Sequence, residues 1–176
     1  MIKKIGNGAW IGLVKLQRIF MVITAIATIL LVAVNIVLRE LALRSGIVLP
    51  FFAYEEILVP VAFWMYMLGS SHGSFEKSQI TADIMSKVLK GRPKAYLQLA
   101  ASILTFILGV IFAYWALTLV QWGFFTGANS TFFSIPVVWG QMSILVGLIL
   151  TSMYNFVYMI QDIINILFTP RLEQEA

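Results

Sequence analysis

The sequence predicts an all-α integral membrane protein with four transmembrane helices. Three observations lead to this prediction: four long apolar stretches, a composition of 60% hydrophobic and only 11% charged residues, and an uneven distribution of Lys and Arg between the stretches. A soluble domain is roughly 25% charged, so this chain lacks the polar residues needed to cover a water-soluble globule. About 20 apolar residues in a helix cross the ~30 Å hydrocarbon core of a bilayer.

Four predicted spans follow one another along the chain, at residues 19–38, 52–71, 96–121 and 137–168. The last is too long to stand upright, so we expect it to tilt, to break, or to end outside the core. Lys3 and Lys4 before an apolar run resemble the start of a signal peptide, but further basic residues up to Arg18 favour an uncleaved first helix. No linker divides the chain, and we expect residues 1–176 to form a single four-helix transmembrane domain.

The basic residues predict that both termini lie in the cytoplasm. Ten Lys and Arg residues then lie inside, namely Lys3, Lys4, Lys15, Arg18, Lys77, Lys87, Lys90, Arg92, Lys94 and Arg171. Only Arg39 and Arg44 lie outside, as the positive-inside rule requires. Because the basic residues sit at span ends and form no single run, they favour a membrane topology signal over a nucleic-acid site.

Two kinds of interfacial residue are expected at the ends of the spans. Ile80, Ile84 and Val88 recur at i, i+4, with charged residues on the wetter face, which predicts a short amphipathic helix in the interface between spans two and three. The interfacial residues on this cytoplasmic side are Asp83, Lys87, Lys90 and Arg92. On the other side, Trp122 and Trp139 bracket an uncharged loop and are expected at the headgroup boundary.

Small residues form two stripes at i, i+4 spacing. One is Ala101, Thr105 and Gly109 in span three, and the other is Ser143 and Gly147 in span four. Helices approach each other in lipid through small residues and hydrogen bonds, because lipid tails are as apolar as leucine. The stripes are therefore interpreted as packing surfaces, either between helices of this chain or against a partner protein.

Charged residues near the outer ends of spans one and two predict an ion pair. Arg39 ends span one, and the adjacent Glu55 and Glu56 open span two at a similar depth. Neighbouring helical residues point about 100° apart, so only one glutamate can face Arg39, and the other is left for a partner or water. An ion pair that joins two helices is one reading; the other is a proton or ion relay, with Asn35 as its deeper polar neighbour.

Residue types that catalysis and cofactors need are scarce. The chain has no cysteine, which excludes disulfides, thiolate nucleophiles and iron–sulfur ligation, and its single histidine, His72, excludes a bis-histidine haem. No paired catalytic carboxylates, Ser/His/Asp set or phosphate-binding loop is visible. We therefore expect no enzyme activity, no cofactor and no metal site.

Several short runs, taken together, give a family resemblance. They are Asn35-Ile-Val-Leu-Arg39, Phe52-Ala-Tyr-Glu-Glu56, Trp64 with Leu68-Gly69, and Gln79-Ile-Thr-Ala-Asp83 before a basic turn. The chain resembles the small membrane subunit of tripartite ATP-independent periplasmic (TRAP) transporters, closest to the sialic-acid branch. That family often carries a histidine a few residues before the Asp, where this chain has Gln79. In this reading Asn35, Trp64 and Gly69 are contact residues for other helices or for a partner subunit.

The resemblance implies a multi-pass protein of the bacterial inner membrane. It implies a large membrane subunit that carries an organic acid, sialic acid in the closest branch, by an elevator motion driven by Na⁺, and a periplasmic substrate-binding protein that delivers it. With few intramembrane polar groups and too few spans for repeated halves, this chain is suited to be a non-transporting scaffold. Two alternatives remain open: an autonomous oligomeric channel or exporter lined by Glu55 or Glu56, and an anchor subunit of a membrane enzyme.

Overall fold

The computed structural model describes residues 2–45, 51–76 and 92–168. This part folds into four α-helices: α1 (Ile2–Ser45), α2 (Phe51–Phe75), α4 (Arg92–Thr126) and α5 (Val138–Phe168). The predicted all-α class is confirmed, and each observed helix covers nearly all of one predicted span. The predicted amphipathic helix around residues 80–90, with Asp83, Lys87 and Lys90, lies outside the described residues.

Three of these helices are long and apolar enough to cross a membrane, over Trp10–Ser45, Tyr96–Thr126 and Val138–Ile164. The chain is therefore a multi-pass membrane protein. At ~1.5 Å per residue, the 36-residue segment of α1 measures about 54 Å, so it tilts in the ~30 Å core or extends beyond it. The α5 helix is continuous, which excludes the break considered for the last span. As far as the structure describes α2, this helix is not one of the three that are long and apolar enough to cross a membrane.

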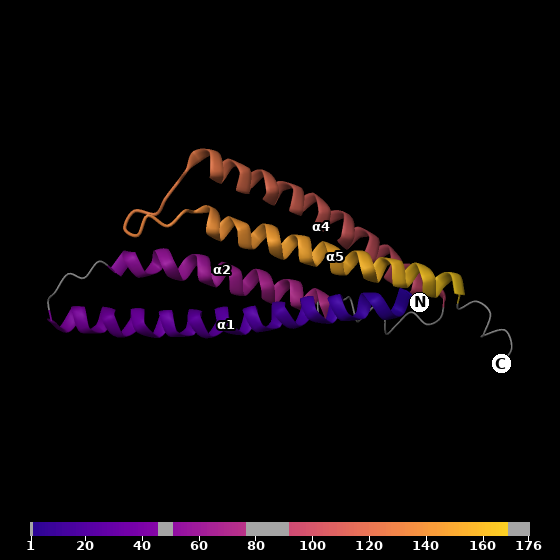
Figure 1. Ribbon diagram of the computed structural model, residues 1–176, viewed down its shortest axis with the longest axis horizontal. Helices are drawn as coiled ribbons and strands as arrows, with labels where there is room; N and C mark the ends of the chain where they lie inside the picture. The colour runs from indigo at the N-terminus through magenta and orange to yellow at the C-terminus, as the bar shows by residue number, and fades with distance from the viewer. Residues whose placement is uncertain (1, 46–50, 77–91, 169–176) are drawn as a thin grey trace.

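The helices lie side by side in a row, in the order α4, α5, α2, α1 (Figure 1). Extensive contacts join α4 to α5, α5 to α2, and α2 to α1. The start of α1 and the end of α5 lie at the same end of the row, which we call the terminal end, and the α4–α5 connection lies at the other, the hairpin end (Figure 1). The described fold is thus one helix thick over most of its length, and at the terminal end α1 also contacts α5.

A regular seam joins α1 to α2. Among the covered positions of α1, a series recurs at intervals of three and four residues, 14, 17, 21, 24, 28, 31, 35, 38 and 42, and positions 10, 13, 25 and 27 beside it are also partly covered. Of these, Val14, Gln17, Thr24 and Ala42 are buried, and Asn35 is half-buried. This 3.5-residue repeat is typical of two helices that pack along their length like a coiled coil.

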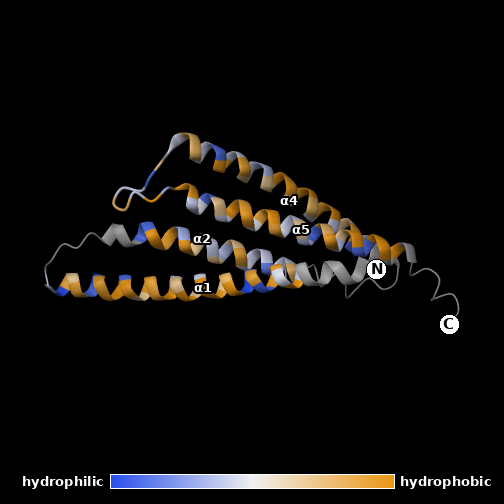
Figure 2. Ribbon diagram, viewed as in Figure 1, coloured by the Kyte–Doolittle hydropathy of each residue, from blue (hydrophilic) through white to orange (hydrophobic). Residues whose placement is uncertain are grey.

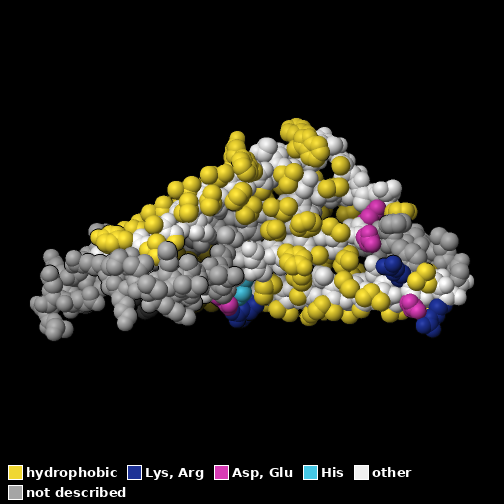
Figure 3. Space-filling view, turned by 180° about the vertical axis from the view of Figure 1, so that it is seen from behind, with side chains coloured by type: hydrophobic (Ala, Val, Ile, Leu, Met, Phe, Trp, Pro, Cys, Tyr) yellow, Lys and Arg dark blue, Asp and Glu magenta, His cyan; other side chains and the backbone are white. Residues whose placement is uncertain are grey.

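The interior of the row is unusually polar, and the outside is apolar. The largest fully buried side chains of the described part are Tyr154, Ser71 and Ser143, whereas long Ile, Leu, Val and Phe side chains are exposed along every helix. Figure 2 shows hydrophobic residues along every helix, and Figure 3 shows apolar side chains spread over one face, with charged side chains gathered in separate places. Such a distribution suits a lipid environment, in which small and polar residues hold the helices together.

Candidate functional site

The α4–α5 connection is a compact hairpin, residues 127–137, built from turn-forming residues. Gly127 adopts a left-handed conformation, with φ of 59°, and its N–H donates to the carbonyl of Gly123 at 3.1 Å, which ends α4. Asn129 and Pro136 form an antiparallel bridge, and the N–H of Ser130 donates to the carbonyl of Ile135 at 2.9 Å. These bonds hold the tip of the hairpin, residues 131–134, in one conformation.

The carboxylate of Glu56 is enclosed by that tip. The Thr131 N–H donates to Oε1 at 2.9 Å, the Phe133 N–H donates to Oε2 at 3.0 Å, and the Phe132 N–H reaches both oxygens at 3.0 and 3.1 Å. Three successive backbone N–H groups make an anion-binding cradle of the kind that often holds phosphates. Here the anion is a side chain of α2, so Glu56 fixes the hairpin to the helix across 75 to 77 residues of sequence. We call this contact the Glu56 latch.

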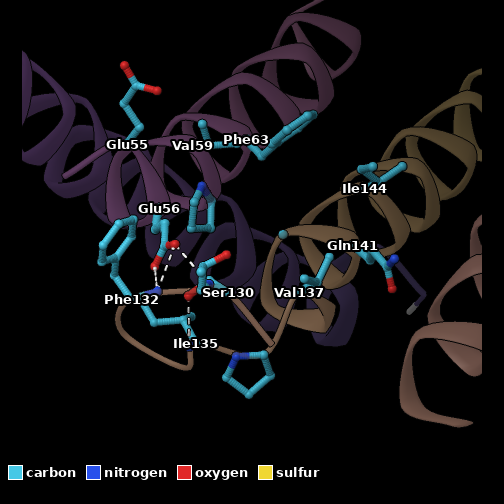
Figure 4. Close-up of a pocket in the computed structure, with 14 residues that line it drawn as sticks. Glu55, Glu56, Val59, Phe63, Ser130, Phe132, Ile135, Val137, Gln141 and Ile144 are labelled. Carbon is cyan, nitrogen blue, oxygen red and sulfur yellow. Dashed lines mark hydrogen bonds between the residues drawn. The ribbon is translucent and has the colours of Figure 1, made fainter. Parts of the chain in front are cut away.

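Arg39 takes no part in the latch. In the described part of the chain, ion pairs join Arg44 to Glu40, Arg18 to Glu76 and His72 to Glu76, and neither Glu55 nor Glu56 pairs with Arg39. The structure therefore corrects the predicted Arg39 ion pair, because backbone N–H groups of the hairpin fill the role that was assigned to the guanidinium. Arg39 and Glu55 are exposed. Glu55 points away from the hairpin (Figure 4).

A groove of about 500 Å³ lies next to the latch, between α2, α5 and the hairpin (Figure 4). Glu55 and Glu56, with Ser130 and Thr131, line it at the hairpin end. Its remaining lining is mostly apolar and comes from Val59, Pro60, Phe63, Phe132, Ile135, Pro136, Val137, Gly140, Gln141 and Ile144. Both glutamates expected to be important in span two thus border a groove.

At the terminal end, three helices meet around the side chain of Gln17. Its Nε2 donates to the carbonyl of Leu68 at 3.1 Å and to Oγ of Ser71 at 2.7 Å, while the Tyr154 hydroxyl donates to its Oε1. Gln17, Ser71 and Tyr154 are all buried. Interhelical bonds of this kind contribute roughly 0.6–2 kcal/mol each in a bilayer, so this cluster ties α1, α2 and α5 together.

Aromatic and ionic contacts extend this cluster. The ring of Trp10 lies edge-on to Tyr154 with centroids 5.3 Å apart, and the ring of Phe75 lies 5.4 Å from the same tyrosine. His72, the single histidine of the chain, is buried, and its Nε2 lies 3.2 Å from Oε1 of Glu76. Its Nδ1 has no hydrogen-bond partner among the described residues.

The small-residue stripes lie on two different helix contacts. Gly147 of α5 meets Met67 of α2, and Gly109 of α4 meets Ser152 of α5. Ser143 is buried and donates to the carbonyl of Gly140 in its own helix at 2.7 Å. Ala101 is exposed and Thr105 half-buried, so the α4 stripe is covered mainly from Gly109 onward.

The remaining predicted residues are spread along the row. Trp64 packs edge-on against Phe20 of α1, with ring centroids 5.7 Å apart. Around Gly69 there is open space, so it is not a close-approach position within this chain. Trp122 and Trp139 lie in the last turns of α4 and the first turn of α5 and are exposed, as a headgroup position requires. Arg92 is the first residue of α4.

Asp162 of α5 is a buried carboxylate that bonds to a neighbouring helix. Only 7% of it is exposed, and Oγ of Ser102 in α4 donates to it at 2.6 Å. Among the described residues, no group of three or more His, Asp or Glu side chains is placed to hold a metal ion. Three polar side chains join separate segments of the fold. Glu56 bonds α2 to the hairpin, Gln17 bonds α1 to α2 and α5, and Asp162 bonds α5 to α4.

Sequence reasoning missed the hairpin as the partner of Glu56 and missed Gln17 altogether. The run of turn formers from Gly127 to Pro136 was a usable signal, because it predicts a tight hairpin with free N–H groups at its tip. Gln17 lies between the basic residues Lys15 and Arg18. The three-and-four repeat that places it on the inward face of α1 is seen in the burial of that helix, which only the structure gives.

Comparison with known families gives one match. Residues 28–167 match the family model for the DctQ component of tripartite ATP-independent periplasmic transporters. The match covers all four helices from the middle of α1 to the end of α5. No curated protein matches the chain.

Proposed function

Because the chain belongs to the DctQ family of tripartite ATP-independent periplasmic transporter components, we propose that it is a non-transporting scaffold subunit. In this role it binds the large membrane subunit and braces it while the moving part of that subunit carries the solute. A periplasmic substrate-binding protein is the third component. Family membership supports the assignment to such a transporter, and the division of labour within it is our proposal.

The observation that carries the scaffold role is the single-layer arrangement of the helices. A transporter encloses its solute site between helices, usually near the bilayer midplane. The described row is one helix thick over most of its length, with two broad faces, and its groove beside the Glu56 latch lies at the hairpin end. Polar residues join neighbouring helices in at least two places, where Gln17 bonds to Tyr154 and Ser102 bonds to Asp162. The long apolar faces offer a wide surface to lipid and to another membrane protein (Figure 3).

We further propose that the transported solute is an organic acid, with sialic acid as the first candidate, and that a Na⁺ gradient drives uptake. The support is the resemblance of the Asn35–Arg39, Phe52–Glu56 and Gln79–Asp83 runs to the sialic-acid branch of this family. On this proposal the chain resides in the bacterial inner membrane as one four-helix domain. The chain itself is assigned no solute site.

The proposed topology has four spans, with α2 as the second span and both termini in the cytoplasm. Ten basic residues on one side against two on the other support it, as does the position of the start of α1 and the end of α5 at the same end of the row. Because the chain has no native cysteine, a single cysteine can be introduced either in the hairpin, at Ser134, or near the C-terminus, at Gln174. A membrane-impermeant thiol reagent added to intact cells from the periplasmic side should label Ser134→Cys and not Gln174→Cys. The reverse pattern would contradict the topology.

The scaffold proposal is tested by reconstitution. Proteoliposomes are prepared with this chain alone, with the large subunit alone, and with both, and each receives the loaded binding protein and an inward Na⁺ gradient. We expect uptake of radiolabelled sialic acid only when both membrane subunits are present. The chain alone should give the background of empty vesicles, because it supplies no solute pathway.

Two results would overturn this assignment. Accumulation of solute, or ion conduction, in vesicles that hold only this chain would favour the channel or exporter. Full uptake by the large subunit alone would remove the need for a scaffold. If the complex forms and transports a different organic acid, the scaffold role stands and only the proposed substrate fails.

A further inference from the structure

The lining of the groove beside the Glu56 latch changes from acidic to apolar along its length. Glu55 and Glu56 lie at its hairpin end, and Val59, Phe63 and Ile144 continue it toward the middle of the row (Figure 4). From Glu55 to Phe63 is eight residues of helix, or about 12 Å at 1.5 Å per residue. The groove therefore has an acidic mouth and an apolar floor, and its volume falls within the ~300–1,000 Å³ that is usual for small-molecule sites.

We propose that this groove binds one phospholipid with a cationic ammonium in its headgroup, of the phosphatidylethanolamine type. The acyl chain lies along Val59, Phe63 and Ile144, and the ammonium lies near the carboxylate of Glu55. The proposal depends on the chain lying in a membrane, and it is independent of the scaffold role.

The apolar floor and the acidic mouth act differently on a lipid. An acyl chain gains little hydrophobic energy by moving from the bilayer into the groove, since both are apolar, but it fills space that would otherwise lack contacts. Selection must therefore come from the headgroup. The Glu56 carboxylate is already occupied by three N–H groups, whereas Glu55 is exposed and makes no ion pair with any described residue.

Charge and dimensions favour a lipid over a helix of another protein. Two adjacent carboxylates at the mouth attract an ammonium and repel an anionic headgroup such as phosphatidylglycerol. From its acidic mouth to Phe63 the groove is only about 12 Å long, two turns of helix, and the hairpin closes one end of it. One acyl chain and the headgroup match this shape, with the head beside Glu55, the tail directed toward the middle of the row, and the second acyl chain left in the bilayer.

The proposal is tested by the lipids that the protein retains. The full chain is extracted with a styrene–maleic acid polymer from vesicles of equal phosphatidylethanolamine and phosphatidylglycerol, transferred to detergent, and analysed by native mass spectrometry. We expect one retained phosphatidylethanolamine, enriched up to about fivefold over phosphatidylglycerol, as one solvent-exposed ion pair allows. Val59→Trp fills the groove and should abolish retention. Val34→Trp is the matched control, since the two valines are 51% and 47% exposed and only Val59 lines the groove.

The headgroup is tested separately from the acyl chain. Glu55→Gln should keep one bound lipid but reduce the preference for phosphatidylethanolamine to near equality. Glu40→Gln removes an exposed carboxylate that is paired with Arg44 and should leave the preference unchanged. If Val59→Trp does not fold, Ile144→Trp fills the same groove from α5 and carries the same expectation.

Three outcomes would overturn the proposal. The first is equal lipid retention by Val59→Trp and Val34→Trp, and the second is an unchanged headgroup preference in Glu55→Gln. The third is a protein occupant: a photo-crosslinking amino acid at Ile144 that reacts with the large subunit, and not with lipid, in the assembled complex would show that the groove is a subunit contact.

Discussion

Gly147→Ala is expected to separate α2 from α5 and to destabilise the chain. A Cβ at this position would lie 2.8 Å from Cβ of Met67 and 3.0 Å from its carbonyl oxygen. These atoms belong to the backbone or are fixed directly to it, so a rotamer change cannot relieve the overlap. Overpacking of this kind typically costs about 1–3 kcal/mol. The measurement is the free energy of unfolding in mixed micelles, from a denaturing-detergent titration followed by tryptophan fluorescence.

Gly140→Ala is the matched control for this substitution. It lies in the same helix and also faces α2, but its Cβ would lie 3.8 Å from Cβ of Pro60, which is an ordinary contact distance. Alanine gains about 1 kcal/mol of helix propensity over glycine in the helix interior, at Gly147, and less in the first turn of α5, at Gly140, so the difference between them is a lower bound on the steric effect. We expect Gly147→Ala to be about 1–3 kcal/mol less stable than Gly140→Ala. Equal stabilities would mean that α2 and α5 are further apart at Met67 than the structure places them.

Other glycines extend this comparison into a ranking. A Cβ on Gly109 would lie 2.7 Å from Oγ of Ser152, which can rotate away at the loss of its bond to the carbonyl of Leu148, so Gly109→Ala should be intermediate. Gly69 has open space around it, and Gly69→Ala should be neutral or stabilising. The sequence predicted the same packing role for Gly69, Gly109 and Gly147, whereas the structure separates them by the atoms that each one faces.

The helices were predictable from sequence because their physical cause is local. An uncharged apolar run predicts a membrane helix regardless of its neighbours, which is why the run at residues 19–38 identified α1. The helix ends were less predictable: α1 continues through Lys15 and Arg18 to Ile2, because long basic side chains can be accommodated on a helix that leaves the membrane. Single-layer packing was not predictable, since a stripe of small residues does not say which helix it meets.

The candidate site was also only partly predictable from the sequence. Glu56 was identified as important because a carboxylate near lipid needs a partner, and that need is a property of the residue itself. The partner was not predictable, since any donor at the right depth would serve, and a guanidinium and a row of backbone N–H groups are equivalent in this respect. Only the position of the hairpin over α2 decides between them, and that position depends on how α4, α5 and α2 pack together.

Glu56→Gln is expected to release the hairpin from α2. The glutamine retains one oxygen, but its NH₂ group replaces the second oxygen and faces N–H groups that need an acceptor. Hydrogen bonds to a charged group are stronger than those to a neutral one, and they weaken where water can replace them, as it can at this exposed hairpin. We expect amide hydrogen exchange of Thr131, Phe132 and Phe133 to become at least tenfold faster.

Glu55→Gln provides the control, because it removes the same charge from the adjacent residue, whose side chain points away from the hairpin (Figure 4). In detergent without added lipid, it should leave exchange at residues 131–133 unchanged. Exchange in α5 beyond Gly147 should be unaffected in both variants, because the packing of Gly147 on Met67 is independent of the latch. If both glutamates protected the hairpin equally, the cause would be the general negative charge near α2, and the specific bonds from three N–H groups to Glu56 would not be what holds the hairpin in place.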